Sequence, residues 1–309
     1  MSKDILTEIA SKSLGDSTSY AVYTDHFDAS LLNPMPRAPA REQWGIKEIP
    51  NGFDSWTCHE ATFLLDNGLP ISGTLKFVYD SRSEMMVESK SAKLYLNSFD
   101  MCRMGPTHAA AISNYENQVK ADLEAILQTE VSVRFFSSDM WTSSGRFNPI
   151  KNYENLVGVN GISQSILERN GVFDDYHGQR DHIEAVNLGT PVSQGWYTNI
   201  LRSRCRHTKQ KDTGLAAIAY SGTTIISPVS LLQQIVSLRE VNEFHEFCAE
   251  RLFDTIRKHM GQGDTLSVML LYSRRGSLDI NPVRYNGDPG PEVEMLRENK
   301  YLPEKVQGQ

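Results

Sequence analysis

The segment from Leu201 to Asp212, LRSRCRHTKQKD, holds a cysteine followed seven residues later by a carboxylate. Five cationic side chains lie between its two ends. A thiol near cations ionises more readily than free cysteine, whose pKa is roughly 8.5, and the thiolate is the nucleophilic form. The segment is therefore a candidate reaction centre built on Cys205. A solvated basic strand that carries a free cysteine explains it equally well.

The same segment alternates in the manner of a β-strand. This pattern predicts that three arginines lie on one side and a serine, the cysteine and a histidine on the other, as follows: Arg202, Arg204 and Arg206 against Ser203, Cys205 and His207. Other parts of the chain must then deliver further groups to the thiol.

The whole chain has ordinary globular composition. Of its 309 residues 39% are hydrophobic and 22% charged, which suits one to three domains with a substantial core. The net charge of −7 does not attract nucleic acid, although the cationic segment is a local exception. The four cysteines form no C-x-x-C pair, which argues against a zinc ribbon or a disulfide framework and fits a reducing cytosol.

The first residues, MSKDILTEIASKSLGDS, lack the apolar segment and small-residue cleavage site of a signal peptide. No apolar run approaches the roughly 18 residues that a membrane-spanning helix needs. We therefore expect a soluble, cytoplasmic protein without a membrane partner.

Residues 1–45 predict a short helix followed by an extended proline-rich arm. Two strands (73–80 and 84–89) should follow, then a short helix over 90–99, a longer amphipathic helix from about Thr107 to Thr129 and a strand over 131–137. We assign residues 46–138 to an N-terminal module.

Residues 139–200 are rich in Gly, Asn and Asp and predict an irregular connector. A second module should span residues 201–290, with a tail over 291–309. Its predicted elements repeat the first set: a strand over 214–222, a possible second over 224–226, a helix from Pro228, a helix capped by Asn242, and strands over 266–273 and 278–285.

Both halves thus give strand, strand, helix, helix, strand, which suggests a diverged duplication. Hairpins that flank consecutive helices imply antiparallel sheets with helices on one face, an α+β architecture.

Two stretches could bind phosphate. Glu88-Ser89-Lys90-Ser91 lies where a strand passes into a helix, so hydroxyls, helix N-terminal amides and lysines meet there. Arg274-Arg275-Gly276 lies in a predicted turn, where a glycine allows close approach to a phosphate. A capped helix with solvated lysines and an ordinary charged turn are the plainer explanations. The chain has no Walker loop and no G-x-G-x-x-G after a strand, so a nucleotide cofactor would bind in a non-Rossmann way.

His245 and Glu246 begin a helix and lie off its apolar stripe, so they are free to face a cleft. The positive potential of a helix N-terminus disfavours a protonated histidine and favours an anionic glutamate. A surface His-Glu pair is the alternative. A further group of acidic and histidine side chains has no spacing typical of a metal site, and we expect no metal there: Asp174, Asp175, His177, Asp181 and His182.

These motifs occur together in an order that resembles the QueF family of NADPH-dependent nitrile reductases in queuosine biosynthesis. The closest match is VESKSAKLYLNSF at 87–99, which looks like the family's defining motif. Others are LRSRC with Thr208, Gln210 and Asp212, NEFHE at 242–246, and SRRGSLDINPVR at 273–284. The resemblance runs from about Gly73 to Arg284, apart from the connector, and the order is typical of the long, two-module type.

The resemblance implies a tandem T-fold (tunnelling fold) that reduces the nitrile of 7-cyano-7-deazaguanine to the 7-aminomethyl compound with NADPH. Cys205 would form a thioimide with the nitrile carbon, Asp212 would move the proton to nitrogen, and His245 would supply protons. The remaining roles follow by position. Val87, Glu88, Ser89, His245 and Glu246 would bind the substrate, and Ser89, Lys90, Arg275 and Gly276 would contact NADPH.

The first half keeps the Glu-Ser-Lys motif and the second keeps His-Glu, so each half retains one part of a site. One complete site per chain follows, within an expected homodimer and without any need for nucleic acid.

The departures from the family surround the nucleophile, where Arg206 and Lys211 replace the usual prolines and Lys209 is a further charge. Two alternatives stay open. One is an amidinotransferase that acts on deazaguanine in tRNA, and the other is a non-catalytic T-fold protein that binds a purine or pterin.

Overall fold

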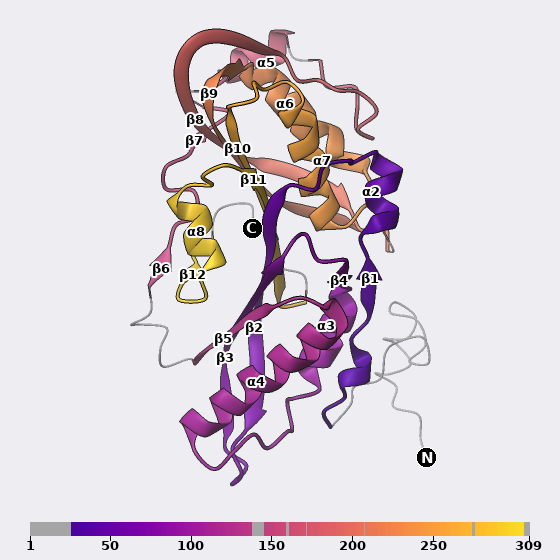
Figure 1. Ribbon diagram of the computed structural model, residues 1–309, viewed down its shortest axis with the longest axis vertical. Coiled ribbons are helices and arrows are strands. Elements are labelled where there is room, and N and C mark those ends of the chain that lie inside the picture. Colours follow the sequence, from indigo (N-terminus) through magenta and orange to yellow (C-terminus); the bar gives the residue numbers. More distant parts are fainter. Residues whose placement is uncertain are drawn as a thin grey trace, which may run out of the picture.

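The computed structural model describes residues 26–137, 145–158, 161–170, 172–206, 208–273 and 276–305. Within them the chain forms an α+β fold around one eight-stranded, mostly antiparallel sheet (Figure 1), with strand order β5-β3-β2-β11-β10-β9-β8-β7. The strands of this sheet are β2 (Asn51–Leu64), β3 (Pro70–Asp80), β5 (Val131–Ser137), β7 (Glu154–Asn155), β8 (Ala185–Arg204), β9 (Lys211–Ile226), β10 (Thr265–Tyr272) and β11 (Leu278–Asn286).

Two pairs of helices cover one face of the sheet and bury separate apolar clusters. The first pair, α3 (Ser89–Asn97) and α4 (His108–Leu127), packs on β2, β3 and β5. The second pair, α6 (Pro228–Val236) and α7 (His245–Arg257), with the 3-10 turn η4 (Ser237–Glu240) between them, packs on β8, β9 and β10. This antiparallel sheet with paired helices is T-fold-like, in agreement with the fold class predicted from the sequence.

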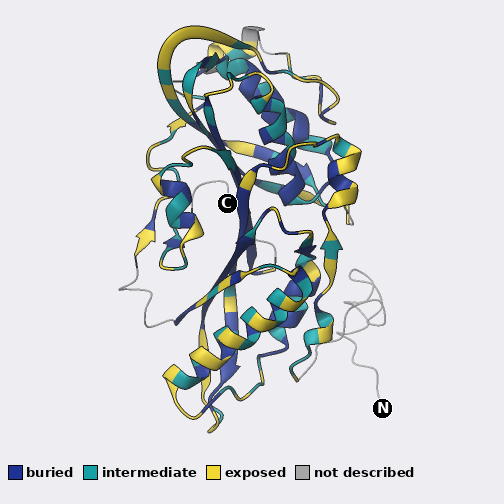
Figure 2. Ribbon diagram, viewed as in Figure 1, coloured by how far each residue is buried: buried dark blue, intermediate teal, exposed yellow. Residues whose placement is uncertain are grey.

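The opposite face of the sheet is covered near its centre by the end of the chain. Helix α8 (Pro291–Arg297) buries Val293 and Leu296 against apolar residues of β2, β9, β10 and β11. Strand β12 (Leu302–Pro303) pairs with β6 (Arg146–Phe147) beside it. The central strands are therefore buried on both faces, as the dark sheet in Figure 2 shows.

The chain before β2 crosses from one helix pair to the other. After η2 (Ala29–Leu31), strand β1 (Pro34–Pro36) pairs with β4 (Met85–Val87), just before α3. Helix α2 (Ala38–Trp44) then lies beside α7 (Figure 1) and ends at Gly45, whose φ of 65° is left-handed. This arm thus contacts both halves of the molecule.

The two halves are joined by backbone pairing. β2 of the first half runs antiparallel to β11, the last strand of the sheet, with Cys58 opposite Leu278 and Gly52 opposite Arg284. The sheet is continuous across this junction, and any pocket at the junction is lined by both halves.

Several sequence predictions need correction. β2 was missed altogether, and the predicted strand over 84–89 is only the short β4, outside the main sheet. The predicted irregular connector is wrong from Ala185 onward, where β8 begins. It also contains β6, β7 and the helix α5 (Gln164–Asn170).

The second half corrects three further predictions. β9 is one strand through Ile226 rather than two. Asn242 does not cap α7, because the cap position is Phe244. The proline-rich arm is partly helical, while the helix predicted at the start of the chain lies outside the described residues. None of the helices in the described ranges is long and apolar enough to cross a membrane.

Candidate active site

A pocket of about 280 Å³ opens at the junction of the two halves. The first half contributes the end of β4 and the start of α3, the second half contributes the β8–β9 turn and the start of α7, and β2 and β11 supply apolar side chains between them. The lining residues used below are Trp56, Val87, Glu88, Ser89, Lys90, Lys93, Cys205, Thr208, Asp212, Glu243, Phe244, His245, Glu246, Gly276, Leu278 and Ile280.

Of the ten site residues predicted from the sequence, the structure brings nine to this pocket. They are Val87, Glu88, Ser89, Lys90, Cys205, Asp212, His245, Glu246 and Gly276. The tenth, Arg275, lies outside the described residues, as does its neighbour Arg274. Segments far apart in the sequence therefore meet at one place.

Cys205 lies in the tight turn between β8 and β9. The strand ends at Arg204, so the predicted alternation up to His207 is wrong beyond it, and His207 lies outside the described residues. The N–H of Cys205 donates to the carbonyl of Gln210 at 2.9 Å, which closes the turn. The N–H of Thr208 donates to Cys205 Sγ at 3.5 Å, an interaction that favours the thiolate over the thiol.

The cationic side chains near Cys205 are largely paired. Arg202 and Arg204 both form ion pairs with Glu240 on η4. Arg206 forms an ion pair with Glu243 at 2.9 Å. The sequence argument that this arginine cluster activates the thiol is therefore weakened, because partner carboxylates offset the positive charge.

The remaining cysteines are less suited to nucleophilic chemistry. Burial raises the pKa of Cys58 to about 11 and that of Cys248 to about 12. Burial also raises the pKa of Cys102, which lies outside the pocket. Cys205 is only partly buried and lines the pocket, so a ligand can reach its thiol.

His245 and Asp212 form a buried pair beside the nucleophile turn. His245 Nε2 lies 3.4 Å from Asp212 Oδ2, and the side chains are 12% and 3% exposed. The imidazole stacks on the ring of Tyr272, with centroids 3.7 Å apart and planes 7° apart. Because stacking fixes the ring plane, the pair is oriented before any ligand binds. This geometry suits proton transfer between the two groups.

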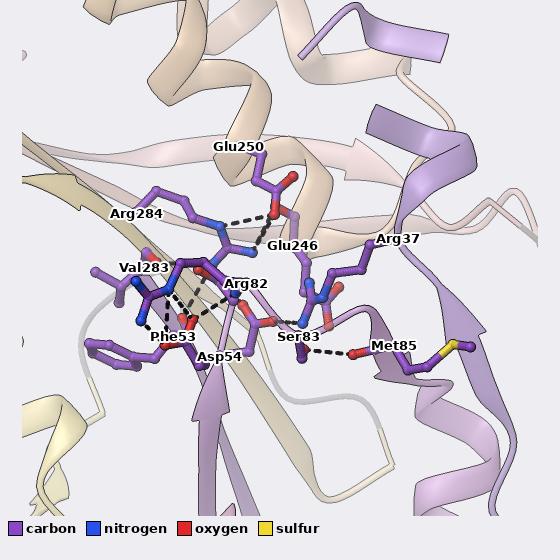
Figure 3. A network of polar contacts seen from close by, with 12 residues as sticks. Arg37, Phe53, Asp54, Arg82, Ser83, Met85, Glu246, Glu250, Val283 and Arg284 are labelled. Carbon is purple, nitrogen blue, oxygen red and sulfur yellow. Dashed lines mark hydrogen bonds and ion pairs between the residues drawn. The ribbon is translucent and has the colours of Figure 1, made fainter. Parts of the chain in front are cut away.

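Glu246, the next residue of α7, borders a buried network of charges (Figure 3). Arg284 on β11 donates to Asp54 on β2 at 2.8 Å and to Glu250 on α7 at 3.1 Å. Arg37 from the arm donates to Asp54 at 2.5 Å. Within the described part of the chain, Nε and Nη1 of Arg37 have no hydrogen-bond acceptor.

Burial and the negative charge of Asp54 raise the pKa of Glu246 to about 8, although Arg37 and Arg284 oppose the shift. The expectation that its place at a helix N-terminus would keep Glu246 anionic is thus wrong. Loss of hydration outweighs the helix potential at this depth.

This shift predicts a pH dependence of stability. Between Glu246's ordinary pKa of 4.5 and its folded value of about 8, the folded protein holds a proton that the unfolded chain has released. The free energy of unfolding should therefore fall as the pH rises through this window. Glu246→Gln cannot titrate and should lose less stability between pH 5 and 8. Urea unfolding at pH 5, 6.5 and 8 compares the two, and parallel curves would contradict the shifted pKa.

The first half contributes the N-terminus of α3. The carboxylate of Glu88 caps this helix and accepts from the N–H groups of Lys90 at 2.9 Å and Ser91 at 2.7 Å. The plainer sequence explanation, a capped helix, is therefore correct as far as it goes. Glu88 also lines the pocket, and each of its carboxylate oxygens can accept a further hydrogen bond from a ligand.

Lys90, Lys93 and Gly276 line the pocket between the start of α3 and the start of β11. Gly276 has a left-handed φ of 56°, and a Cβ there would approach Lys93 Nζ to 2.6 Å. Glycine thus leaves room for the lysine at the pocket wall, with Lys90 and Ser89 next to it. These donors fit the phosphates of a dinucleotide.

Sequence reasoning missed Glu243 and the apolar walls of the pocket. Glu243 is 2% exposed, and Phe244 and Trp56 supply aromatic surface. Glu243 and Phe244 were quoted within the NEFHE motif, and their place directly before His245 was the available signal. Trp56 lies on the unpredicted β2 and had none.

The acidic and histidine group around Asp175 is a loop-stabilising arrangement. Asp175 accepts from three backbone N–H groups, those of His177, Gln179 and Arg180, and contacts His182. Among the residues that the structure describes, no three His, Cys, Asp or Glu side chains are placed to hold a metal ion.

Fold and site together define a class: a T-fold-like α+β protein whose pocket presents a thiol, a carboxylate–imidazole pair and a buried glutamate. Residues 23–135 match the family model described as nitrile reductase, 7-cyano-7-deazaguanine-reductase N-term. This match supports the QueF family for the N-terminal part of the chain, and the 309 residues fit the long, two-module type.

Proposed function

We propose that this protein reduces the nitrile of 7-cyano-7-deazaguanine to 7-aminomethyl-7-deazaguanine, with NADPH, in queuosine biosynthesis. The observation that carries the proposal is the single pocket in which Cys205, the Asp212–His245 pair and Glu246 converge. The family match of residues 23–135 supports it independently, because that match does not include Cys205, Asp212 or His245.

The pocket suits a flat aminopyrimidinone base. Its volume of about 280 Å³ and its aromatic and aliphatic walls, Trp56, Phe244, Leu278 and Ile280, fit a bicyclic ring. The donor edge of the base presents N–H groups, which carboxylate acceptors on Glu246 and Glu88 would bind. Since burial raises the pKa of Glu246 to about 8, binding of the base to its carboxylate would release a proton.

Cys205 carries the covalent step. Its sulfur forms a bond with the nitrile carbon while one π bond of C≡N breaks. The thiol proton passes to Asp212 and from there to the nitrile nitrogen, so the product is a neutral thioimide and no redox change occurs. Addition of sulfur turns a poor hydride acceptor into an imine-like carbon. His245 then protonates the nitrogen as the C–N bond is reduced.

Ser89, Lys90, Arg275 and Gly276 would hold the cofactor, with Lys93 as an added phosphate contact. NADPH supplies hydride when bound, and a nitrile needs two hydrides in succession to become an amine. Between them the pocket must exclude water, because an intermediate imine would hydrolyse.

We further propose that residues 46–138 and 201–290 are diverged copies of one T-fold module. Each half pairs two helices with strands of the sheet over its own apolar cluster. The first half supplies Glu88 and Lys90, and the second supplies Cys205, Asp212 and His245, so that one chain would make one complete site. The homodimer expected from the family resemblance would then contain two sites, each formed by the residues of one chain.

The function is tested first without reductant. Mixing the protein with 7-cyano-7-deazaguanine should produce a new thioimide absorbance and a mass increase equal to that of the substrate. Adding NADPH should then consume two equivalents per substrate as the absorbance disappears. A protein that forms no adduct and oxidises no NADPH would contradict the proposal.

A further inference from the structure

Arg206, the residue after the nucleophile, is tied to a buried carboxylate. Its Nη1 donates to both oxygens of Glu243, at 3.0 and 2.9 Å. The Arg206 side chain is 42% exposed, whereas that of Glu243 is 2% exposed. The exposed guanidinium of Arg206 thus pairs with a carboxylate that is almost inaccessible to water. Burial of the Glu243 charge is costly unless partners such as Arg206 compensate it.

Glu243 is also bonded to two other parts of the chain. The indole N–H of Trp44, at the end of α2, donates to Oε2 at 3.0 Å, and the backbone N–H of Phe244 donates to Oε1 at 3.0 Å. The guanidinium of Arg251 stacks over the Trp44 ring at 3.9 Å. Arg206 adds a bond to Gln43 of the same helix at 3.3 Å. Glu243 thus connects the arm, the nucleophile turn and α7.

Arg204, the residue before the nucleophile, joins the end of β8 to the segment before α7 through two backbone hydrogen bonds. Arg204 N–H donates to Val241 O at 2.9 Å, and Glu243 N–H donates to Arg204 O at 3.0 Å. Within the turn, Cys205 N–H donates to Gln210 O and Lys209 N–H donates to Cys205 O. The side chain of Arg206 adds a connection from this turn to Glu243, just before α7.

We propose that Arg206 is a positioning residue whose pairing with Glu243 holds Cys205 in register with His245 and Glu246. The inference rests on the proposed function and goes beyond it. Glu243 lies two residues before His245, so the tie joins the nucleophile turn to the part of α7 that carries the proton donor and the substrate-binding carboxylate.

Loss of the tie should impair attack by the thiol more than binding of the substrate. A displacement of about 1 Å can cost roughly a hundredfold in rate, whereas contacts with the base are made elsewhere. In Arg206→Ala we expect the rate of thioimide formation to fall about 10- to 100-fold. The Kd for reversible binding, measured in a Cys205→Ala background, should change less than about threefold.

The variant set separates positioning from stability. Arg206→Lys should restore part of the rate, because a lysine keeps the charge but loses the bidentate geometry. Arg206→Ala leaves Glu243 buried without its cation, which destabilises the fold by itself, so Arg206→Ala with Glu243→Gln is the companion variant. The double variant should be no slower than Arg206→Ala, since both changes break one pair. Arg202→Ala is the matched control, because it removes another arginine–glutamate pair, from the strand β8 that leads into the turn.

Hydrogen exchange gives a readout that needs no nitrile. The amides of residues 205–210 should exchange about tenfold faster in the Arg206 variants and at the wild-type rate in Arg202→Ala. The inference would be overturned if Arg206→Ala formed the thioimide at the wild-type rate. It would also be overturned if the affinity for the substrate fell by the same factor as the rate of thioimide formation. If the wild-type protein forms no adduct, the proposed function fails and the exchange rates alone test the role of the Arg206–Glu243 pair. Unchanged exchange in the Arg206 variants then rejects that role, and faster exchange supports it.

Discussion

Replacing Cys205 with alanine is expected to lower the rate of nitrile reduction by about 10⁴-fold or more and to abolish the thioimide. Without sulfur the nitrile carbon never becomes imine-like, so Asp212 and His245 have no intermediate to protonate. The side chain is only partly buried, and its removal should leave the fold intact. NADPH oxidation and the mass of the protein after incubation with substrate measure the two effects.

Cys102→Ala is the matched control. Cys102 is also partly buried, donates to Ser98 O at 3.3 Å and lies outside the pocket, so its loss should change neither readout. An alanine variant at position 205 that retained reduction within tenfold of wild type would exclude covalent catalysis by this thiol. Tight binding of the deazaguanine without turnover in the wild type would instead favour a non-catalytic binding protein.

Asp212→Asn is expected to slow thioimide formation by about 10³-fold, the range of general acid–base catalysis. The amide keeps the volume of the side chain at a site that is 3% exposed, yet it cannot take the thiol proton. It also leaves His245 Nε2 without an anionic partner. Stopped-flow absorbance without NADPH isolates this step from the reduction.

A second aspartate–histidine pair provides the control. Asp181 Oδ2 lies 2.7 Å from His259 Nε2, and the two side chains are 44% and 34% exposed. Neither residue lines the pocket. Asp181→Asn should leave both steps unchanged. If Asp212→Asn formed the thioimide at the wild-type rate and only its reduction slowed, Asp212 would act through His245 rather than on the thiol.

The sequence predicted well the elements with a clear apolar pattern, either one apolar face of a helix or an apolar run in a strand. The long helix α4 shows its apolar face at helical spacing, and β5 and β10 were found within a residue of their bounds. β2 was missed because it is buried on both faces, as β10 is, but carries the polar residues Asp54, Ser55 and Thr57 where a buried strand usually has an apolar run. Asp54 is a buried charge whose partners, Arg37 and Arg284, come from distant segments.

β8 was missed for the opposite reason. It lies near the edge of the sheet, is exposed over much of its length, and contains Gly189, Pro191 and Gly195 together with two register shifts in its pairing with β9. Each of these features is typical of a loop. Local composition cannot reveal that a long neighbouring strand supplies the hydrogen bonds.

The candidate site was predictable as a set of motifs, but its chemistry was not. The family resemblance indicated which residues meet, whereas each motif alone had a plainer structural explanation. The protonated state of Glu246 and the pairing of Arg206 with Glu243 depend on burial and on partners distant in sequence. From the sequence, the helix N-terminus predicted an anionic Glu246, which is the wrong protonation state. Neither helix position nor net charge indicated that Arg206 pairs with Glu243.

The pairing of β2 with β11 has a consequence for the order of events during synthesis. β2 leaves the ribosome early, yet its partner is nearly the last strand to be made. Until then β2 presents an open hydrogen-bonding edge, which is a template for association with other nascent chains. Such distant pairings also form slowly. Because Leu278 and Ile280 of β11 form part of the pocket, the pocket can bind a ligand only when the chain is almost complete.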